Sequence, residues 1–333
     1  VVIQSAILGV GAYLTLQHET TGGAMIAASI IVGRALAPME QAIGGWRNMI
    51  GAMASYRRLG ELLRQFPASP NFTKLPEAKG RVTAQALNYT PKGRQEPIVR
   101  HVSFDLPAGE CLGIVGPSGA GKSSLARLMV GALRPTAGSV RLAGAEIWFT
   151  DAGHRSKYVG YLPQDVELFD GTVRDNIARF QNASDEAVTT AAQNAGAHEL
   201  ILGLPQGYET VIGAMGLPLS GGQRQRIGLA RAMFGTPKLV VLDEPNSNLD
   251  GEGESALVAA IQKLKAGGTT VIFISQRFGI LNTVDKLMIV ASGMVQAFGP
   301  RDEVMPKLKL ATSDQNSIGR EPAAPTRSGG RAK

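Results

Sequence analysis

The sequence contains a single cysteine, four histidines and few aromatic residues, which make up 5% of its 333 residues. One cysteine, Cys111, cannot form an internal disulfide, and the histidines offer no Cys/His spacing of the kind that binds zinc. The composition therefore excludes a disulfide scaffold and a structural zinc site. The length exceeds that of one ordinary domain, roughly 100–200 residues, and predicts more than one.

Positive charge is concentrated at the C-terminal end. The formal net charge is +7, and residues 307–333 hold six basic and two acidic residues in a stretch rich in Ala, Ser, Pro and Gly. No aromatic residues lie between the basic ones, as they would in an arm that binds nucleic acid. We interpret residues 309–333 as a disordered basic tail that aids solubility or contacts a membrane surface, and we expect no nucleic-acid partner.

The N-terminal residues form two apolar runs. Residues 1–16 carry no charge, residues 17–23 are polar, and residues 24–38 are apolar apart from Arg34. Each run is shorter than the roughly 18–20 residues of a membrane span, so by length alone a buried core hairpin fits equally well. However, the turn between the runs contains no Lys or Arg whereas five arginines follow by residue 64, which is the asymmetry of a cytoplasmic side.

We therefore predict that residues 1–66 are the C-terminal part of a transmembrane domain. It would contain two membrane helices, the first one truncated because the sequence opens inside an apolar run, and a helical extension into the cytoplasm. Three prolines, Pro67, Pro70 and Pro76, then predict a linker over residues 67–80, since no helix would continue through them.

A phosphate-binding motif follows the linker. Residues 111–115 are an apolar run of strand length, and they lead into the sequence GPSGAGKSS and then a helical stretch. This is the GxxxxGK[ST] motif in its expected setting between a strand and a helix, where backbone N–H groups and the helix N-terminus bind phosphate oxygens. In this phosphate loop Lys122 would contact the β- and γ-phosphates of ATP, and the Ser123 hydroxyl would bind Mg²⁺. The predicted nucleotide-binding residues of the loop are Gly116, Pro117, Ser118, Gly119, Ala120, Gly121, Lys122, Ser123 and Ser124.

A second motif lies at the end of another expected strand. Residues 239–242 are four consecutive aliphatic residues, typical of a parallel strand buried on both faces, and Asp243 and Glu244 follow directly. Ligands bind at the carboxyl ends of strands in open α/β sheets. We expect Asp243 to hold hydrated Mg²⁺ and Glu244 to act as the catalytic base for the attacking water. Taken alone, a pair of capping acids would fit equally well.

A third motif, LSGGQ at residues 219–223, precedes an amphipathic helix whose N-terminus forms a second anion site. At this point the sequence resembles the ATP-binding cassette (ABC) family, in which LSGGQ is the signature. The resemblance implies that Ser220, Gly221, Gly222 and Gln223 of one chain contact the ATP bound to the phosphate loop of a second chain. It predicts an α/β fold, a P-loop NTPase cassette over residues 81–308 with a helical subdomain.

Other positions match the family. Tyr89 matches the aromatic residue that stacks on adenine, although a core aromatic is the alternative, and Gln164 matches the glutamine that touches Mg²⁺. Residues 246–250 match the D-loop at the dimer interface. The helical subdomain is expected between Gln164 and the signature, where Thr172 with Asp175, and Ser184, have the spacing of helix N-caps.

Longer stretches of sequence narrow the resemblance. The segments around residues 4–46, 160–180, 242–250 and 294–304 resemble the ATPase component of bacterial type I secretion systems, in its protease and lipase exporter branch. That family implies a homodimer in the inner membrane, multi-pass, with the cassette in the cytoplasm. Its partners would be a periplasmic adaptor (membrane fusion protein) and an outer-membrane channel, and its substrate a protein with a C-terminal secretion signal.

Two positions depart from the family pattern. Gln276 stands where a histidine usually contacts the γ-phosphate, and Ala214 stands where an acidic residue usually precedes the signature. We expect Glu244, Gln276 and Lys122 to be the catalytic residues, and we expect slow ATP hydrolysis because Gln276 replaces the histidine. The alanine at position 214 puts the coupling of hydrolysis to transport in question. Two alternatives remain open: a degenerate, weakly hydrolysing cassette, suggested by these two departures, and a soluble ABC ATPase acting on DNA or ribosomes, against which the apolar N-terminal runs argue.

Overall fold

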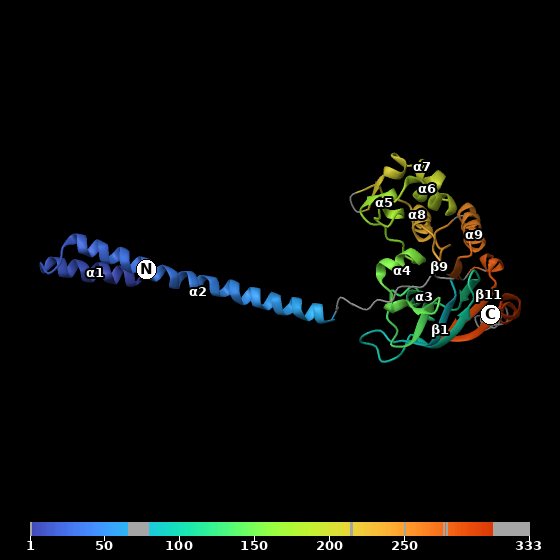
Figure 1. Ribbon diagram of the computed structural model, residues 1–333, viewed down its shortest axis with the longest axis horizontal. Helices are drawn as coiled ribbons and strands as arrows, with labels where there is room; N and C mark the ends of the chain where they lie inside the picture. Colours follow the sequence, from blue (N-terminus) through green and yellow to red (C-terminus); the bar gives the residue numbers. More distant parts are fainter. Residues whose placement is uncertain are drawn as a thin grey trace, which may run out of the picture. The chain divides into compact units, whose positions relative to one another are not determined.

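The computed structural model describes residues 2–65, 80–213, 216–249, 251–275, 277 and 279–308. The chain divides into two compact units, Val1–Pro70 and Asn71–Lys333, which we describe separately (Figure 1). The predicted tail at 309–333 and nearly all of the predicted linker lie outside the described residues.

The N-terminal unit consists of two helices, α1 (Val2–Leu16) and α2 (Gly22–Gln65). They pack closely at Gly11, where an added Cβ would lie 2.5 Å from the Met25 side chain. Helix α2 is long and apolar enough to cross a membrane, with a mean hydropathy of 1.5 over its most apolar window, and it runs on as a single helix through the extension we expected. Helix α1 is apolar but shorter than a span, so a second membrane helix stays a prediction.

A six-stranded sheet forms the centre of the second unit. Its strand order is β12-β11-β3-β10-β9-β6, and all neighbours are parallel except β12. The predicted apolar runs are the buried central strands, so the expected α/β fold is confirmed. The strands are β3 (Cys111–Val115), β6 (Val159–Leu162), β9 (Leu239–Asp243), β10 (Thr270–Ile274), β11 (Lys286–Ala291) and β12 (Met294–Pro300).

Alternate residues of these strands pack into two different cores. In β3, Cys111 and Val115 belong to the core that includes helices α8 and α9, whereas Leu112 and Ile114 face the core that includes α3 and a second sheet. This alternation explains why the strands are apolar on both faces. Cys111 is buried in the core, and this burial raises its pKa to about 12. The thiol therefore has a structural role and is not reactive.

The second sheet is antiparallel, in the order β2-β1-β4-β5. It packs against the same face of the central sheet as helix α3 does. Its strands are β1 (Val82–Tyr89), β2 (Val99–Leu106), β4 (Ala137–Leu142) and β5 (Ala145–Glu146). Figure 1 shows β1 close to α3, the helix that follows the phosphate loop, and residues of both elements belong to the same core. The loop that joins β1 to β2 is therefore near that site.

A group of short helices, α5 to α7, stands apart from both sheets in Figure 1. Its predicted helix starts are confirmed: Thr172 and Asp175 form a capping box, and the Ser184 side chain accepts a hydrogen bond from the Ala187 N–H. A two-stranded ribbon of β7 (Gly171–Thr172) and β8 (Val211–Ile212) closes this group. The labelled helices of the second unit are α3 (Lys122–Met129), α4 (Ala152–Tyr158), α5 (Val173–Ile177), α6 (Asp185–Asn194), α7 (His198–Leu202), α8 (Gly221–Met233) and α9 (Gly251–Ala266), with single 3-10 turns at Ile147–Phe149, Gly207–Glu209 and Ile280–Thr283. Residues 301–308 are also helical.

Candidate functional site

The phosphate loop curls between β3 and α3, and its glycines are required by its backbone. Gly121 has φ +92° and an added Cβ would lie 2.7 Å from the Ile98 carbonyl oxygen. At Gly116 an added Cβ would lie 2.0 Å from the Val290 carbonyl oxygen, so no side chain fits there. The first N–H groups of α3 have no partner within the helix, and the N-cap, Gly121, provides no side chain to cap them. The loop thus has the shape and the donors of an anion site.

Lys122, the first residue of α3, is more enclosed than its place in a loop motif suggests. Its side chain is 5% exposed, and Nζ donates to the carbonyl oxygens of Gly116 and Pro117 at 2.9 and 2.8 Å. Burial lowers the pKa of Lys122, while the nearby carboxylates of Glu244 and Asp243 act in the opposite direction. The ammonium group therefore lies inside the curl of the loop, next to where the loop would hold a phosphate.

Asp243 lies at the end of β9 and is almost fully buried. The Ser123 hydroxyl donates to Asp243 Oδ1 at 3.2 Å, and among the described residues Oδ2 has no hydrogen-bond partner. Burial raises the pKa of Asp243, because the charged form loses its hydration. A buried carboxylate oxygen with no partner, beside a serine hydroxyl, fits the oxygen ligands that Mg²⁺ prefers. The described part of the chain has no group of three or more His, Cys, Asp or Glu that could hold a metal ion, so Mg²⁺ here would also need ligands other than these four residue types.

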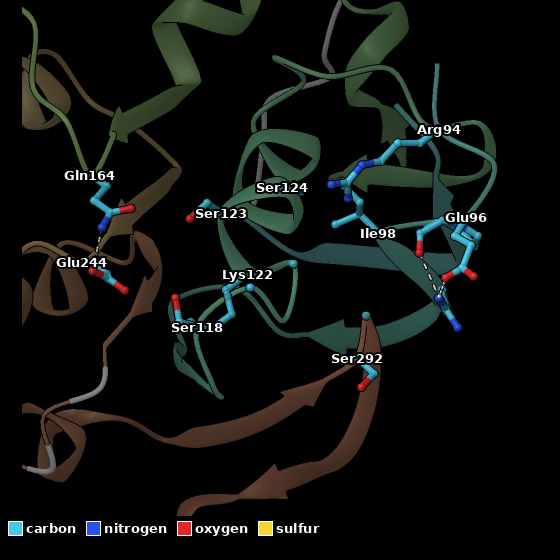
Figure 2. A pocket seen from close by; sticks show the side chains of 15 residues that line it. Arg94, Glu96, Ile98, Ser118, Lys122, Ser123, Ser124, Gln164, Glu244 and Ser292 are labelled. Carbon is cyan, nitrogen blue, oxygen red and sulfur yellow. Dashed lines mark hydrogen bonds and ion pairs between the residues drawn. The ribbon is translucent and has the colours of Figure 1, made fainter. Parts of the chain in front are cut away.

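Glu244 follows Asp243 and adopts a left-handed backbone, with φ +49°. Its side chain faces Gln164, whose Nε2 donates to Glu244 Oε2 at 2.9 Å (Figure 2). A left-handed conformation costs energy for a residue with a side chain and is concentrated at functional sites. It turns the carboxylate toward Gln164 and the phosphate loop.

One cavity of about 510 Å³ collects most of these groups. Figure 2 shows Gln164 and Glu244 at one side of it, the phosphate loop in the middle, and Arg94, Glu96 and Ile98 at the far side. The motif residues that line the cavity are Ser118, Gly119, Gly121, Lys122, Ser123, Ser124, Gln164 and Glu244.

The far side of the cavity was not predicted from the sequence. It is formed by the loop between β1 and β2, the start of β2 and the turn after β11, and none of these segments contains a recognised motif. The residues are Arg94, Glu96, Pro97, Ile98, Arg100, Ser292 and Gly293. Arg100 holds the loop in place, because it donates to Glu96 at 3.1 Å and to the Pro97 carbonyl at 3.1 Å. The charged stretch KGRQEP was the available signal in the sequence.

Tyr89, expected to stack on adenine, is not among the residues that line the cavity. It ends β1, is partly buried and packs against the core shared by the second sheet. Its carbonyl accepts a hydrogen bond from the Ile98 N–H at 2.8 Å, and Ile98 does line the cavity. Tyr89 thus lies next to the far side of the cavity without contributing to its wall.

The signature residues are also outside this cavity. Ser220 is the N-cap of α8: its Oγ accepts from the Gln223 N–H at 3.2 Å, and Gln223 Oε1 accepts from the Ser220 N–H at 2.9 Å. This capping box leaves Ser220 exposed at the helix N-terminus, followed by Gly221 and Gly222. Within one chain, the phosphate loop and the signature therefore form two separate surfaces.

Three predicted positions, Ala214, Asp250 and Gln276, lie outside the described residues. Both neighbours of Gln276 are described: Ser275, which follows β10, is fully buried, and Arg277 forms an ion pair with Glu254.

Comparisons with known proteins agree with this geometry. The ABC transporter family profile matches residues 99–247. The chain is 47% identical over 304 residues to the type I secretion system ATP-binding protein PrsD of Rhizobium meliloti, covering 91% of this chain and 52% of that protein. It is 33% identical over 301 residues to the leukotoxin translocation ATP-binding protein LktB of a Pasteurella haemolytica-like species, covering 90% and 42%.

A solved structure is also similar. It is a bacterial Atm1-family ABC exporter with ATP bound, which has a TM-score of 0.77 and 26% sequence identity, over 97% of this chain and 57% of that chain. The chain thus spans about half the length of the curated relatives it matches.

Proposed function

This chain belongs to the ABC transporter family, in its type I secretion branch, and from that premise we propose that it is the ATP-hydrolysing portion of a protein exporter. The observation that carries the proposal is the cavity at the phosphate loop. The side chains of Lys122, Ser123, Gln164 and Glu244 line this cavity. Asp243 lies beside them and accepts a hydrogen bond from Ser123. This set matches what phosphoryl transfer from ATP requires: charge neutralisation, metal ligands and a base.

The residues divide the work along the cavity. Lys122 neutralises charge on the β- and γ-phosphates, and the backbone N–H groups of residues 116–124 bind the phosphate oxygens. Ser123, Asp243 and Gln164 would hold Mg²⁺, which would shield the phosphate charge. Glu244 accepts the proton of the attacking water, and Gln164 orients that carboxylate through the 2.9 Å hydrogen bond. The adenine would lie toward Tyr89 and Ile98.

A second copy of the chain completes each site in this proposal. Ser220 to Gln223 do not line the cavity of their own chain, and Ser220 is exposed at the N-terminus of a thirteen-residue helix. A helix N-terminus favours an anion, so it would bind the γ-phosphate of ATP held by the partner. Two ATP sites would then form at a head-to-tail interface between two identical chains. ATP binding closes the dimer and so drives transport, and ATP hydrolysis returns the dimer to its open state.

The membrane assignment rests on α2 and on the relatives. We propose that residues 1–66 are the last two helices of the membrane domain with their cytoplasmic extension, residues 67–80 a linker, and residues 81–308 the cassette. The protein would lie in the inner membrane with a periplasmic adaptor and an outer-membrane channel as partners. Relatives named for secretion and for leukotoxin translocation support a protein as the exported substrate. We propose that this substrate has a C-terminal signal.

The test is ATP hydrolysis by the full exporter in detergent micelles or nanodiscs. We expect steady phosphate release that needs Mg²⁺ and stops with EDTA, together with fractionation of the protein into carbonate-washed membranes. Nucleotide binding without any phosphate release would favour the degenerate cassette. Hydrolysis by protein that stays in the soluble fraction would favour a soluble ABC ATPase.

Gln276 predicts slow turnover. An amide can donate a hydrogen bond to the γ-phosphate, but it cannot carry positive charge toward the transition state as a histidine with a pKa near 6.5 can. One electrostatic donor is commonly worth a rate factor on the order of ten to a thousand. We therefore expect Gln276→His to raise kcat while ATP affinity barely changes, as measured by steady-state ATPase assays. Equal turnover numbers would mean that neighbouring residues already compensate for the glutamine.

A further inference from the structure

Gln225 is a buried amide in the second turn of α8, and none of the roles above uses it. Its side chain is 2% exposed. Nε2 donates to the Pro245 carbonyl at 2.6 Å and to the Glu244 carbonyl at 3.3 Å, and Oε1 accepts from the Asn248 N–H at 3.2 Å. One side chain of the signature helix thus satisfies three backbone groups in the turn that follows β9.

That turn begins at Glu244, one of the non-glycine residues with a left-handed backbone. Glu244 has φ +49°, and its carbonyl accepts from the Ser247 N–H at 3.2 Å as well as from Gln225. A left-handed conformation at a residue with a side chain persists only where the surroundings hold it. Gln225 supplies such a hold, since it bonds directly to the carbonyl of Glu244 and to that of the next residue.

The signature turn packs against the same segment. An added Cβ at Gly222 would lie 3.1 Å from the Asn248 carbonyl oxygen, and one at Gly221 would lie 3.4 Å from the Asn248 side chain. The first turn of α8 therefore packs against Asn248, most tightly at Gly222. The start of α8 therefore contacts the turn 244–248 in two ways: Gly221 and Gly222 pack against Asn248, and the Gln225 amide forms hydrogen bonds with the backbone of the turn.

We propose that Gln225 is a positioning residue that holds Glu244 in its reactive orientation and ties it to the signature of the same chain. The inference rests on the proposed function, in which Glu244 serves this chain's ATP and Ser220 serves the partner's ATP. A displacement of α8 that withdraws Ser220 from the partner's nucleotide would pull on Glu244 through Gln225. Each chain would then link the two ATP sites of the dimer by this one buried amide.

The test is Gln225→Met in the full exporter, which keeps the side-chain length but removes the donor and the acceptor. We expect kcat to fall about 10- to 100-fold, because misplacement of a catalytic group by an ångström costs that much. The dissociation constant of a fluorescent ATP analogue should change less than about twofold, since Gln225 does not line the cavity. Hydrogen exchange at the Asn248 amide should become faster, because that N–H loses its acceptor. The milder Gln225→Asn, whose amide is too short to reach both carbonyls, should give a smaller fall in kcat.

Asn176 provides the matched control. It is another fully buried amide with three bonds to backbone groups, to Phe169 N, Phe169 O and Thr172 O, in the group of short helices. Asn176→Leu should lower the melting temperature as Gln225→Met does but leave kcat and exchange at Asn248 near the wild-type values. Equal losses of kcat in the two variants, or a matching loss of ATP affinity in Gln225→Met, would overturn the proposal.

The two inferences can fail separately. If the wild-type exporter hydrolyses no ATP, the proposed function fails, and exchange at Asn248 still decides whether Gln225 holds the turn. If the wild type hydrolyses ATP and both Gln225 variants do so at the same rate, only the positioning role fails.

Discussion

Lys122→Ala should weaken ATP binding by roughly 30- to 150-fold, the equivalent of about 2–3 kcal/mol for the loss of charge-assisted contacts to two phosphates. The ammonium group lies within the curl of the phosphate loop, where burial already lowers the pKa of Lys122. A phosphate there would meet a cation with little competing water. Equilibrium titration with a fluorescent ATP analogue measures the effect.

The variant also removes two hydrogen bonds inside the loop, from Nζ to the Gly116 and Pro117 carbonyls. Because the Lys122 side chain is only 5% exposed, a thermal unfolding curve must accompany the titration. Lys92→Ala is the matched control, because Lys92 is an exposed lysine of the β1–β2 loop that does not line the cavity. A folded Lys122→Ala protein that binds ATP as well as Lys92→Ala does would refute the assignment of the loop.

Ser220→Arg should abolish ATP hydrolysis in the dimer and leave ATP binding by single chains within about twofold of wild type. The arginine would occupy the helix N-terminus that we propose for the partner's γ-phosphate, and it would hold the two chains apart. Binding to the chain's own cavity should survive, because Ser220 does not line that cavity. Steady-state ATPase assays and titration with the fluorescent analogue separate the two effects.

Ser184→Arg is the control for the loss of a helix cap. Ser184 is also an exposed N-cap serine, at α6, and losing either cap costs about 1 kcal/mol. Ser184→Arg should retain hydrolysis. Mixing Ser220→Arg with Lys122→Ala at equal amounts should restore at most about a quarter of wild-type activity, since half of the dimers are mixed and each has one intact site. Full activity of the Ser220→Arg protein, or of a strictly monomeric preparation, would contradict sites shared between chains.

Features that depend on contiguous residues were predictable. The phosphate loop was recognised because its glycines, lysine and serine are consecutive and follow an apolar strand. The backbone explains why the motif is this strict, since an added Cβ at Gly116 would collide with the Val290 carbonyl. The helix caps at Thr172 and Ser184 were predictable for the same reason, because a cap and its N–H partner are three residues apart.

Features that depend on residues distant in sequence were not predictable in detail. The sequence by itself determined the α/β class, the buried parallel strands and the identity of the motif residues, because each of these depends on a short pattern of consecutive residues. Only the tertiary structure decided that Gln164 bonds to Glu244, that Arg94 and Ile98 form the far side of the cavity, and that Lys122 is buried. It also decided that Gln225 bonds to the turn after β9. The physical reason is that these contacts depend on how strands and helices from distant segments pack, and no local pattern of residues encodes that register.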